Sequence, residues 1–159
     1  MLFRSSKLLQ SEPKYIRGVI DQVVKTEKNT DRAAMKVYHA VSARIMERFL
    51  PLYKASGGQE GFVTIQDDPR RDYDADHTVK VNLKAAKLGR NFMAKIPVIS
   101  GGSEAIGELV ARNIPVCATE IFSVSQAVHI CERYKKAAKK SGNRPPFYVT
   151  HITGLFDQY

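Results

Sequence analysis

The sequence predicts an α/β fold with a parallel sheet, and two observations support this prediction. From Gly61 onward, short apolar runs alternate with amphipathic stretches of roughly 10 to 18 residues. The links between these runs are short, as in consecutive βαβ units with right-handed crossovers. No Gly-x-Gly-x-x-Gly or Walker loop follows a predicted strand, which argues against a nucleotide-binding sheet. The pattern alone leaves open whether the sheet is open or closes into a barrel.

Two helices are expected before the sheet. Apolar residues recur at helical spacing over residues 13 to about 25. The segment Asn29-Thr30-Asp31 then supplies a cap for a long amphipathic helix, which we expect to end near Pro51. Gly57-Gly58 breaks the chain after it.

The remaining elements follow in strict alternation. We predict strands over residues 61–66, 92–96, 114–119 and 147–151. We predict helices over residues 72–88, 103–112 and about 123–140. Ser123, three residues before Gln126, reads as the N-cap of the last helix.

Composition excludes several classes of protein. No apolar run reaches the roughly 18 residues of a membrane span, so we expect no membrane partner and a cytoplasmic location. The two cysteines, Cys117 and Cys131, show no metal-ligand or disulfide spacing. The net charge of +9 is carried largely by solvated helix faces without a nucleic-acid motif, so no nucleic-acid partner is expected.

Aspartates gather after the first predicted strand, at positions 67, 68, 72, 74 and 76. A metal site is conceivable there, but capping of a helix and attraction to its dipole explain acidic residues at a helix start more simply. We therefore expect no metal and no cofactor.

Lys95 lies inside an apolar strand, between Ala94 and Ile96. Lysine is almost never fully buried without a purpose. Burial disfavours the ammonium and leaves a neutral amine, which can attack a carbonyl and form a Schiff base. The alternative is a lysine that extends to the strand end and pairs with a carboxylate.

Four segments, in order and at matching spacing over about 100 residues, resemble the transaldolase family with its fructose-6-phosphate aldolase branch. They are QDDPR at 66–70, AKIPV at 94–98, IPVCATEIFSVSQA at 114–127 and THITGLFD at 150–157. The resemblance implies strands three to six of a partial TIM (β/α)8 barrel, preceded by two helices. Residues 1–159 would form a single incomplete domain, with a helical segment over 1–56 and βα units over 57–159.

The resemblance also implies roles for individual residues. Lys95 would be the Schiff-base lysine on the fourth barrel strand. Gln66 and Thr119 would position a water molecule, and Cys117 and Thr150 would line the pocket. Active sites of such barrels lie at the C-terminal ends of the strands, where these residues are expected.

Several positions depart from the family pattern. Gln66 stands where transaldolases have a glutamate, and an amide orients water but cannot take its proton. Cys117 replaces an asparagine that binds substrate hydroxyls; the aldolase branch shares the glutamine and lacks that asparagine. Leu155 replaces a phosphate-gripping arginine, and a leucine cannot bind phosphate. His151 is a further candidate, but strand alternation should point it to the opposite face.

The implied function is a Schiff-base-forming transaldolase of carbohydrate metabolism, as in the pentose phosphate pathway. It would transfer or cleave a dihydroxyacetone unit of a ketose or ketose phosphate. The alternatives are a fructose-6-phosphate-aldolase-like aldolase on unphosphorylated substrates, a non-catalytic sugar-binding barrel and an inactive fragment. A full barrel needs about 250 residues, so we expect truncation rather than a half-barrel that assembles, although open strand edges allow a homo-oligomer.

Overall fold

The computed structural model describes residues 12–154 of the 159-residue chain. Leu155, the position matched to the family's arginine, lies outside the described residues. The chain divides into two compact units, Met1–Ile45 and Met46–Tyr159. The expectation of a single domain stays a prediction, and the two units are described separately.

The first unit contains helix α2 (Pro13–Thr26) and the start of helix α3 (Thr30–Ala55). Asn29 caps α3 as predicted, because its Oδ1 accepts a hydrogen bond from the Arg32 N–H at 3.0 Å. Tyr15 joins the two helices: its hydroxyl donates to the Ala40 carbonyl at 3.5 Å, and the Arg44 guanidinium lies 4.3 Å from its ring centre.

The prediction that the second helix ends near Pro51 is wrong, because α3 continues through Pro51 to Ala55. A proline removes one backbone hydrogen bond and crowds the preceding turn, but the other hydrogen bonds of a long helix can keep it continuous. The helix ends where two glycines adopt the left-handed conformation, with φ of 62° at Gly57 and 83° at Gly58. The chain break predicted at Gly57-Gly58 is therefore present.

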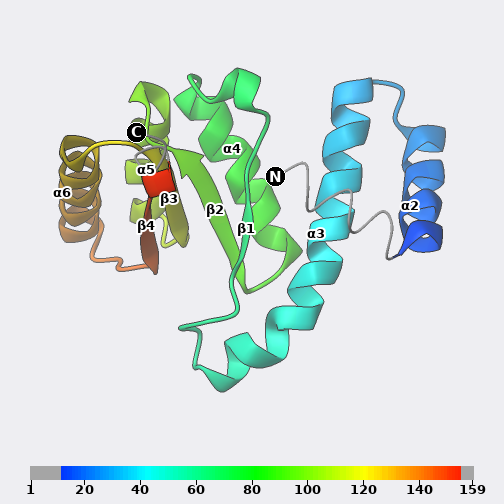
Figure 1. Cartoon of the computed structure of the whole chain (residues 1–159), viewed down its shortest axis with the longest axis horizontal. Coiled ribbons are helices and arrows are strands. Elements are labelled where there is room, and N and C mark those ends of the chain that lie inside the picture. Colours follow the sequence, from blue (N-terminus) through cyan, green and yellow to red (C-terminus); the bar gives the residue numbers. More distant parts are fainter. Residues whose placement is uncertain (1–11, 155–159) are drawn as a thin grey trace. The chain divides into compact units, whose positions relative to one another are not determined.

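The second unit holds a four-stranded sheet in the order β1-β2-β3-β4, with every neighbouring pair parallel (Figure 1). Its strands are β1 (Val63–Ile65), β2 (Phe92–Pro97), β3 (Val116–Ile121) and β4 (Phe147–His151). Its helices are α4 (Ala75–Ala85), α5 (Ser100–Ala111) and α6 (Val124–Ser141), with short 3-10 turns η1 (Pro69–Arg71) and η2 (Ala86–Leu88).

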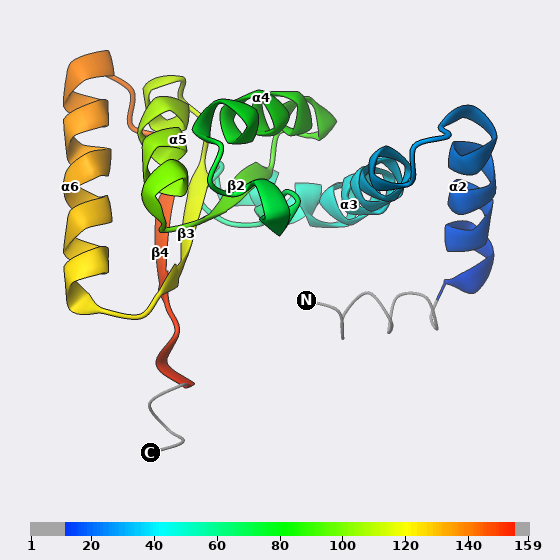
Figure 2. The same cartoon turned by 90° about the horizontal axis from the view of Figure 1, so that it is seen from above.

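The three helices lie on the same side of the sheet (Figure 2). This is the arrangement of consecutive right-handed βαβ units, and a parallel sheet with all its helices on one side matches part of a TIM barrel. The predicted fold class is confirmed.

Side-chain caps mark the starts of α4, α6 and the turn η1. The Asp74 carboxylate accepts from the His77 N–H at 2.9 Å, so α4 starts at Ala75 rather than at the predicted residue 72. Asp68 caps the preceding turn in the same way. The Ser123 hydroxyl accepts from the Gln126 N–H at 3.2 Å, as predicted for the start of α6.

The core lies between the two central strands and α5. Met93, Ala94 and Val116 have no exposed surface, and neither have Ile106 and Leu109 of α5. Helix α5 approaches β2 so closely that a Cβ at Gly102 would overlap the Pro97 carbonyl oxygen. This contact fixes the start of α5 directly beside the C-terminal end of β2.

Candidate active site

The predicted site residues share one face of the sheet. Lys95 of β2 is in register with Cys117 of β3, and Cys117 is in register with Tyr148 of β4. In-register residues of neighbouring parallel strands point to the same face, and side chains alternate along each strand. Gln66 follows Ile65, which pairs with Ala94, so Gln66 lies level with Lys95. Thr119 and Thr150 lie two residues beyond Cys117 and Tyr148 on this face, which we call the inner face.

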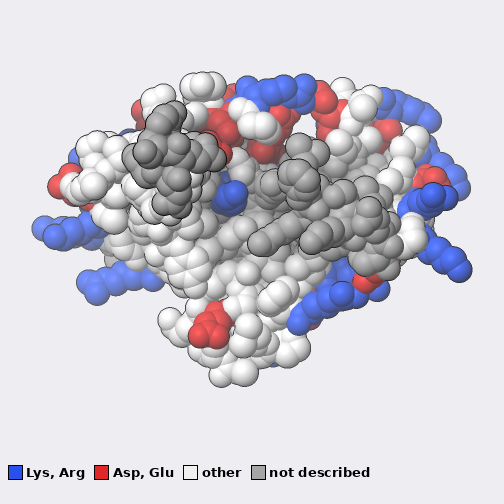
Figure 3. Space-filling model, in the orientation of Figure 1, with Lys and Arg blue, Asp and Glu red and all other residues white. Residues whose placement is uncertain are grey.

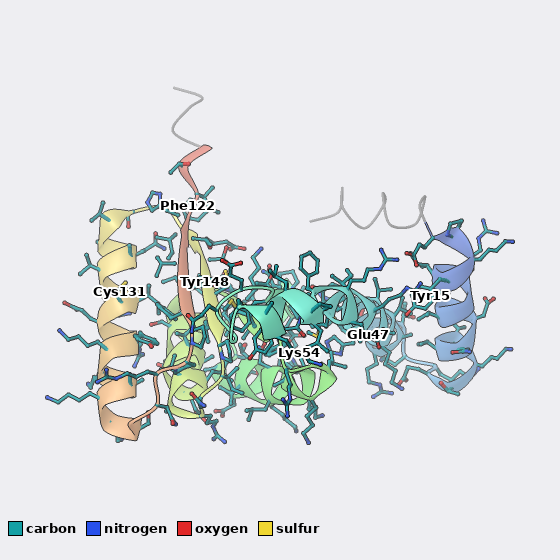
Figure 4. All side chains as sticks on the ribbon, turned by 90° about the horizontal axis from the view of Figure 1, so that it is seen from below. Tyr15, Glu47, Lys54, Phe122, Cys131 and Tyr148 are labelled. Carbon is teal, nitrogen blue, oxygen red and sulfur yellow. The ribbon has the colours of Figure 1, made fainter. Side chains whose placement is uncertain are left out.

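The inner face is concave. Across the inner face, the rings of Phe62, just before β1, and Tyr148 of β4 lie 6.1 Å apart, edge to face. In a flat sheet neighbouring strands lie about 4.8 Å apart. The strands β1 and β4 are three spacings apart, so a flat sheet would separate them by much more than the 6.1 Å between the two rings. The Tyr148 hydroxyl also donates to the Gln59 carbonyl at 3.1 Å. Figure 4 shows Tyr148 on the side of β4 away from α6.

An aromatic bridge crosses the inner face. Tyr53 near the end of α3 packs edge-to-face on Phe62, with ring centres 5.3 Å apart, and Phe62 packs in turn on Tyr148. At the β4 side the bridge is level with the predicted site, because Tyr148 is in register with Cys117 and Cys117 with Lys95. The bridge therefore places aromatic rings beside the candidate site.

Lys95 is the only half-buried residue of β2, all others being buried. Its position within an apolar strand agrees with the sequence interpretation. It is neither sealed in the core nor a surface lysine. A ligand on the inner face could therefore reach the amine.

Cys117 and Thr150 are in contact. The Cys117 Sγ lies 3.9 Å from the Thr150 Oγ1, and the Thr150 hydroxyl donates to the Ala118 carbonyl at 2.9 Å. Burial raises the pKa of the Cys117 thiol, against smaller opposing effects of the Thr150 contact and the Lys95 charge. The thiol is thus protonated at neutral pH, and Lys95 is close enough for its charge to affect the pKa of the thiol.

Carboxylates gather beyond the C-terminal ends of the strands. Figure 3 shows Asp and Glu side chains at the end toward which the strands of Figure 1 point. Burial, together with the negative charges of Glu120, Asp67 and Asp68, raises the pKa of Asp72 to about 6. Asp67 also pairs with the His77 Nε2 at 2.8 Å. Among the described residues, no group of His, Cys, Asp and Glu side chains has the arrangement of a metal site.

The sequence interpretation missed two contributors to this region. Tyr148 lies on the inner face two residues before Thr150, so strand alternation could have identified it. Glu120 has a φ of 58°, at a register shift between β3 and β4. Such a bulge changes the direction in which a side chain points, and no local sequence pattern at Glu120 marks the bulge. His151 pairs in register with Ile121 and is exposed.

Comparison with known proteins identifies the family. A model of the family "Transaldolase/Fructose-6-phosphate aldolase" matches residues 6–149. Transaldolase 1 of Streptomyces avermitilis is 32% identical over 123 residues, covering 75% of this chain and 30% of the relative. Transaldolase 1 of Streptomyces coelicolor is 33% identical over 129 residues, covering 79% of this chain and 31% of the relative.

The chain thus spans about a third of the length of these relatives. Over the described residues, no helix is both long and apolar enough to cross a membrane. The matched segment contains β1, β2, β3 and residues 147–149 of β4, and each of the inner-face residues except Thr150. The chain belongs to the transaldolase/fructose-6-phosphate aldolase family.

Proposed function

We propose that this chain carries the Schiff-base site of a transaldolase-like enzyme that transfers or cleaves the dihydroxyacetone unit of a ketose or ketose phosphate. The observation that carries the proposal is the half-buried Lys95 on the inner face, in register with Cys117 and level with Gln66. An amine among buried neighbours, reachable from a concave face, suits attack on a carbonyl. Family membership supports the same chemistry.

In this proposal the Lys95 Nζ attacks the ketose carbonyl and forms a carbinolamine, which loses water to give an iminium. The iminium withdraws electrons from the adjacent carbon–carbon bond, so that this bond can break or form. Gln66 and Thr119 hold the water that takes part in proton transfer. Cys117 and Thr150 line the pocket beside the donor.

A second candidate is an aldolase acting on unphosphorylated sugars. The amide of Gln66 favours it, since an amide can orient a water molecule but cannot act as its base. The Cys117 thiol, a weak hydrogen-bond donor, also favours substrates that need fewer hydroxyl contacts at this wall. A sugar-binding barrel without turnover is the corresponding non-catalytic function.

The proposed partners are a small sugar or sugar phosphate in the cytoplasm. A homo-oligomer is also proposed, because among the described residues β1 and β4 each pair on one edge only. Unpaired strand edges promote association between chains.

Borohydride trapping tests the proposed function. The protein is incubated with dihydroxyacetone and, separately, with fructose 6-phosphate, then reduced and mapped by peptide mass spectrometry. We expect a reduced adduct on Lys95, no adduct in Lys95→Met, and an unchanged adduct in Lys87→Met, which alters an exposed lysine. An adduct with dihydroxyacetone alone would favour the aldolase candidate. Absence of any adduct on Lys95 would contradict Schiff-base chemistry and leave the binding function.

A further inference from the structure

Cys117 lies directly beside Lys95 in the sheet and carries a transferable proton. The two residues are Cα partners on neighbouring strands, and the Lys95 charge acts on the thiol. Their side chains share the inner face, where neighbouring strands are about 4.8 Å apart. A carbonyl carbon bound to Lys95 would therefore form over the same face of the sheet that carries the Cys117 sulfur.

The hydrogen bonds around Thr150 determine which way the Cys117 proton points. Thr150 has one hydroxyl proton, and it is donated to the Ala118 carbonyl at 2.9 Å. In the 3.9 Å contact with the Cys117 sulfur, the Thr150 oxygen must then be the acceptor and the thiol the donor. Cys117 is thus a protonated thiol hydrogen-bonded to Thr150, and a turn about its Cα–Cβ bond would bring the proton toward a substrate on Lys95.

We propose that Cys117 is the catalytic proton carrier of the Lys95 site, performing the acid–base step that the amide of Gln66 cannot perform. This inference rests on the proposed function. It assigns Cys117 a role beyond lining the pocket. It also explains how a site with glutamine at position 66 can turn over.

The proton balance of the proposed step is complete. The thiol of Cys117 protonates the hydroxyl of the Lys95 carbinolamine, which leaves as water and produces an iminium. The resulting thiolate is stabilised by the positive iminium beside it. It then removes the proton from the adjacent carbon, giving the neutral enamine and restoring the thiol. One proton is given and one is recovered, without an oxidant or a cofactor.

The other groups around Cys117 fit this role less well. On the inner face, Lys95 of β2 is consumed as the nucleophile, and the Tyr148 hydroxyl of β4 is engaged with the Gln59 carbonyl. Asp72 and Glu120 lie near the C-terminal ends of the strands, and no contact joins either of them to Lys95 in the structure. Cys117 combines a transferable proton with direct register with Lys95.

The test compares enamine formation with Schiff-base formation. Exchange of the carbon-bound hydrogens of dihydroxyacetone with deuterium oxide, followed by NMR, reports the enamine, and borohydride trapping reports the iminium. The variants are Cys117→Ser, which keeps the shape, and Cys117→Ala. Cys131→Ala, at an exposed cysteine of α6, is the matched control. Far-UV circular dichroism confirms that each variant is folded.

We expect exchange to fall about 100-fold in both Cys117 variants, the lower range for general acid–base catalysis. The trapped adduct on Lys95 should persist at equilibrium, and Cys131→Ala should match the unmodified protein. Undiminished exchange in folded Cys117→Ser or Cys117→Ala would overturn the inference. So would loss of the adduct in parallel with exchange, because Cys117 would then only shape the pocket. If the unmodified protein forms no adduct, the proposed function fails and this inference fails with it.

Discussion

At the scale of single residues, the local environment decides what each side chain can do. Lys95 is notable in the sequence as a lysine inside an apolar strand, but its adjacency to Cys117 arises only from the β2–β3 register. Asp72 is a comparable case, since its unusual carboxyl results from burial and from the charges of Glu120, Asp67 and Asp68. Burial and like charge both penalise the ionised form.

Replacing Asp72 by asparagine should therefore stabilise the protein at pH 8. The pKa of Asp72 is about 6 in the folded protein, against an ordinary value of 3.8, so the folded state takes up this proton first as pH falls. Stability from this group rises as pH falls from about 6 to about 4. The advantage of Asp72→Asn should accordingly shrink over the same window and vanish near pH 4.

Urea unfolding of both proteins at pH 8, 5 and 4 measures this difference. Asp21→Asn, at an exposed position of α2, serves as the control for loss of one carboxylate. A constant difference between Asp72→Asn and the unmodified protein at all three pH values would contradict the assigned environment.

At the scale of elements, close approach of backbones sets the geometry of the site. Helix α5 starts against β2 with the backbone of Gly102 on the Pro97 carbonyl, and Gly101 lies equally close to the carbonyl of Tyr73. The exit loop of β1 and the end of β2 are thus both packed on the first turn of α5. This packing holds the strand ends that carry Gln66 and Lys95.

The variant Gly102→Ala should destabilise the protein by about 1–3 kcal/mol, because its Cβ would overlap backbone rather than a movable side chain. Gly18→Ala in α2 is the matched control. Open space surrounds Gly18, so alanine at this helix position should raise the free energy of unfolding by about 0.5–1 kcal/mol. Denaturant unfolding provides both values. A Gly102→Ala protein as stable as the unmodified chain would show that α5 does not approach β2 this closely.

The number and order of elements could be predicted from the sequence, because apolar periodicity and caps such as Asn29 and Ser123 are local signals. The ends of the helices were harder to predict from the sequence. Pro51 predicted a stop that α3 does not make, and the capping role of Asp74 moved the start of α4. The inner face followed from strand alternation once the register was known. The bulge at Glu120 and the contact of Tyr148 with Phe62 depend on sheet curvature, which no local pattern encodes.

At the scale of the whole second unit, stability is concentrated in the centre of the sheet. Strands β2 and β3 pair on both edges and contain residues without exposed surface, whereas Tyr148, Val149 and Thr150 of β4 are exposed. Regions with few buried contacts open most readily. Of the two strands that pair with β3, we therefore expect β4 to open more readily than β2.

Hydrogen exchange followed by mass spectrometry should reveal this gradient. We expect amides of β2, β3 and α5 to exchange slowest, and those of β4 to exchange earlier, because β4 pairs only with β3 in the described structure. Equal protection of β4 and β2 would contradict this order. It would indicate that a further strand or another copy covers the outer edge of β4.

The bond from Tyr148 to Gln59 also has a consequence for how the unit folds. It joins positions 89 residues apart, and closing so long a flexible loop costs about 4 kcal/mol of chain entropy. A hydrogen bond returns only about 1 kcal/mol. The bond therefore cannot guide an unfolded chain, and it forms after β2 and β3 have brought the two edges together. The contact that joins the two sides of the inner face is therefore among the last features to be acquired during folding.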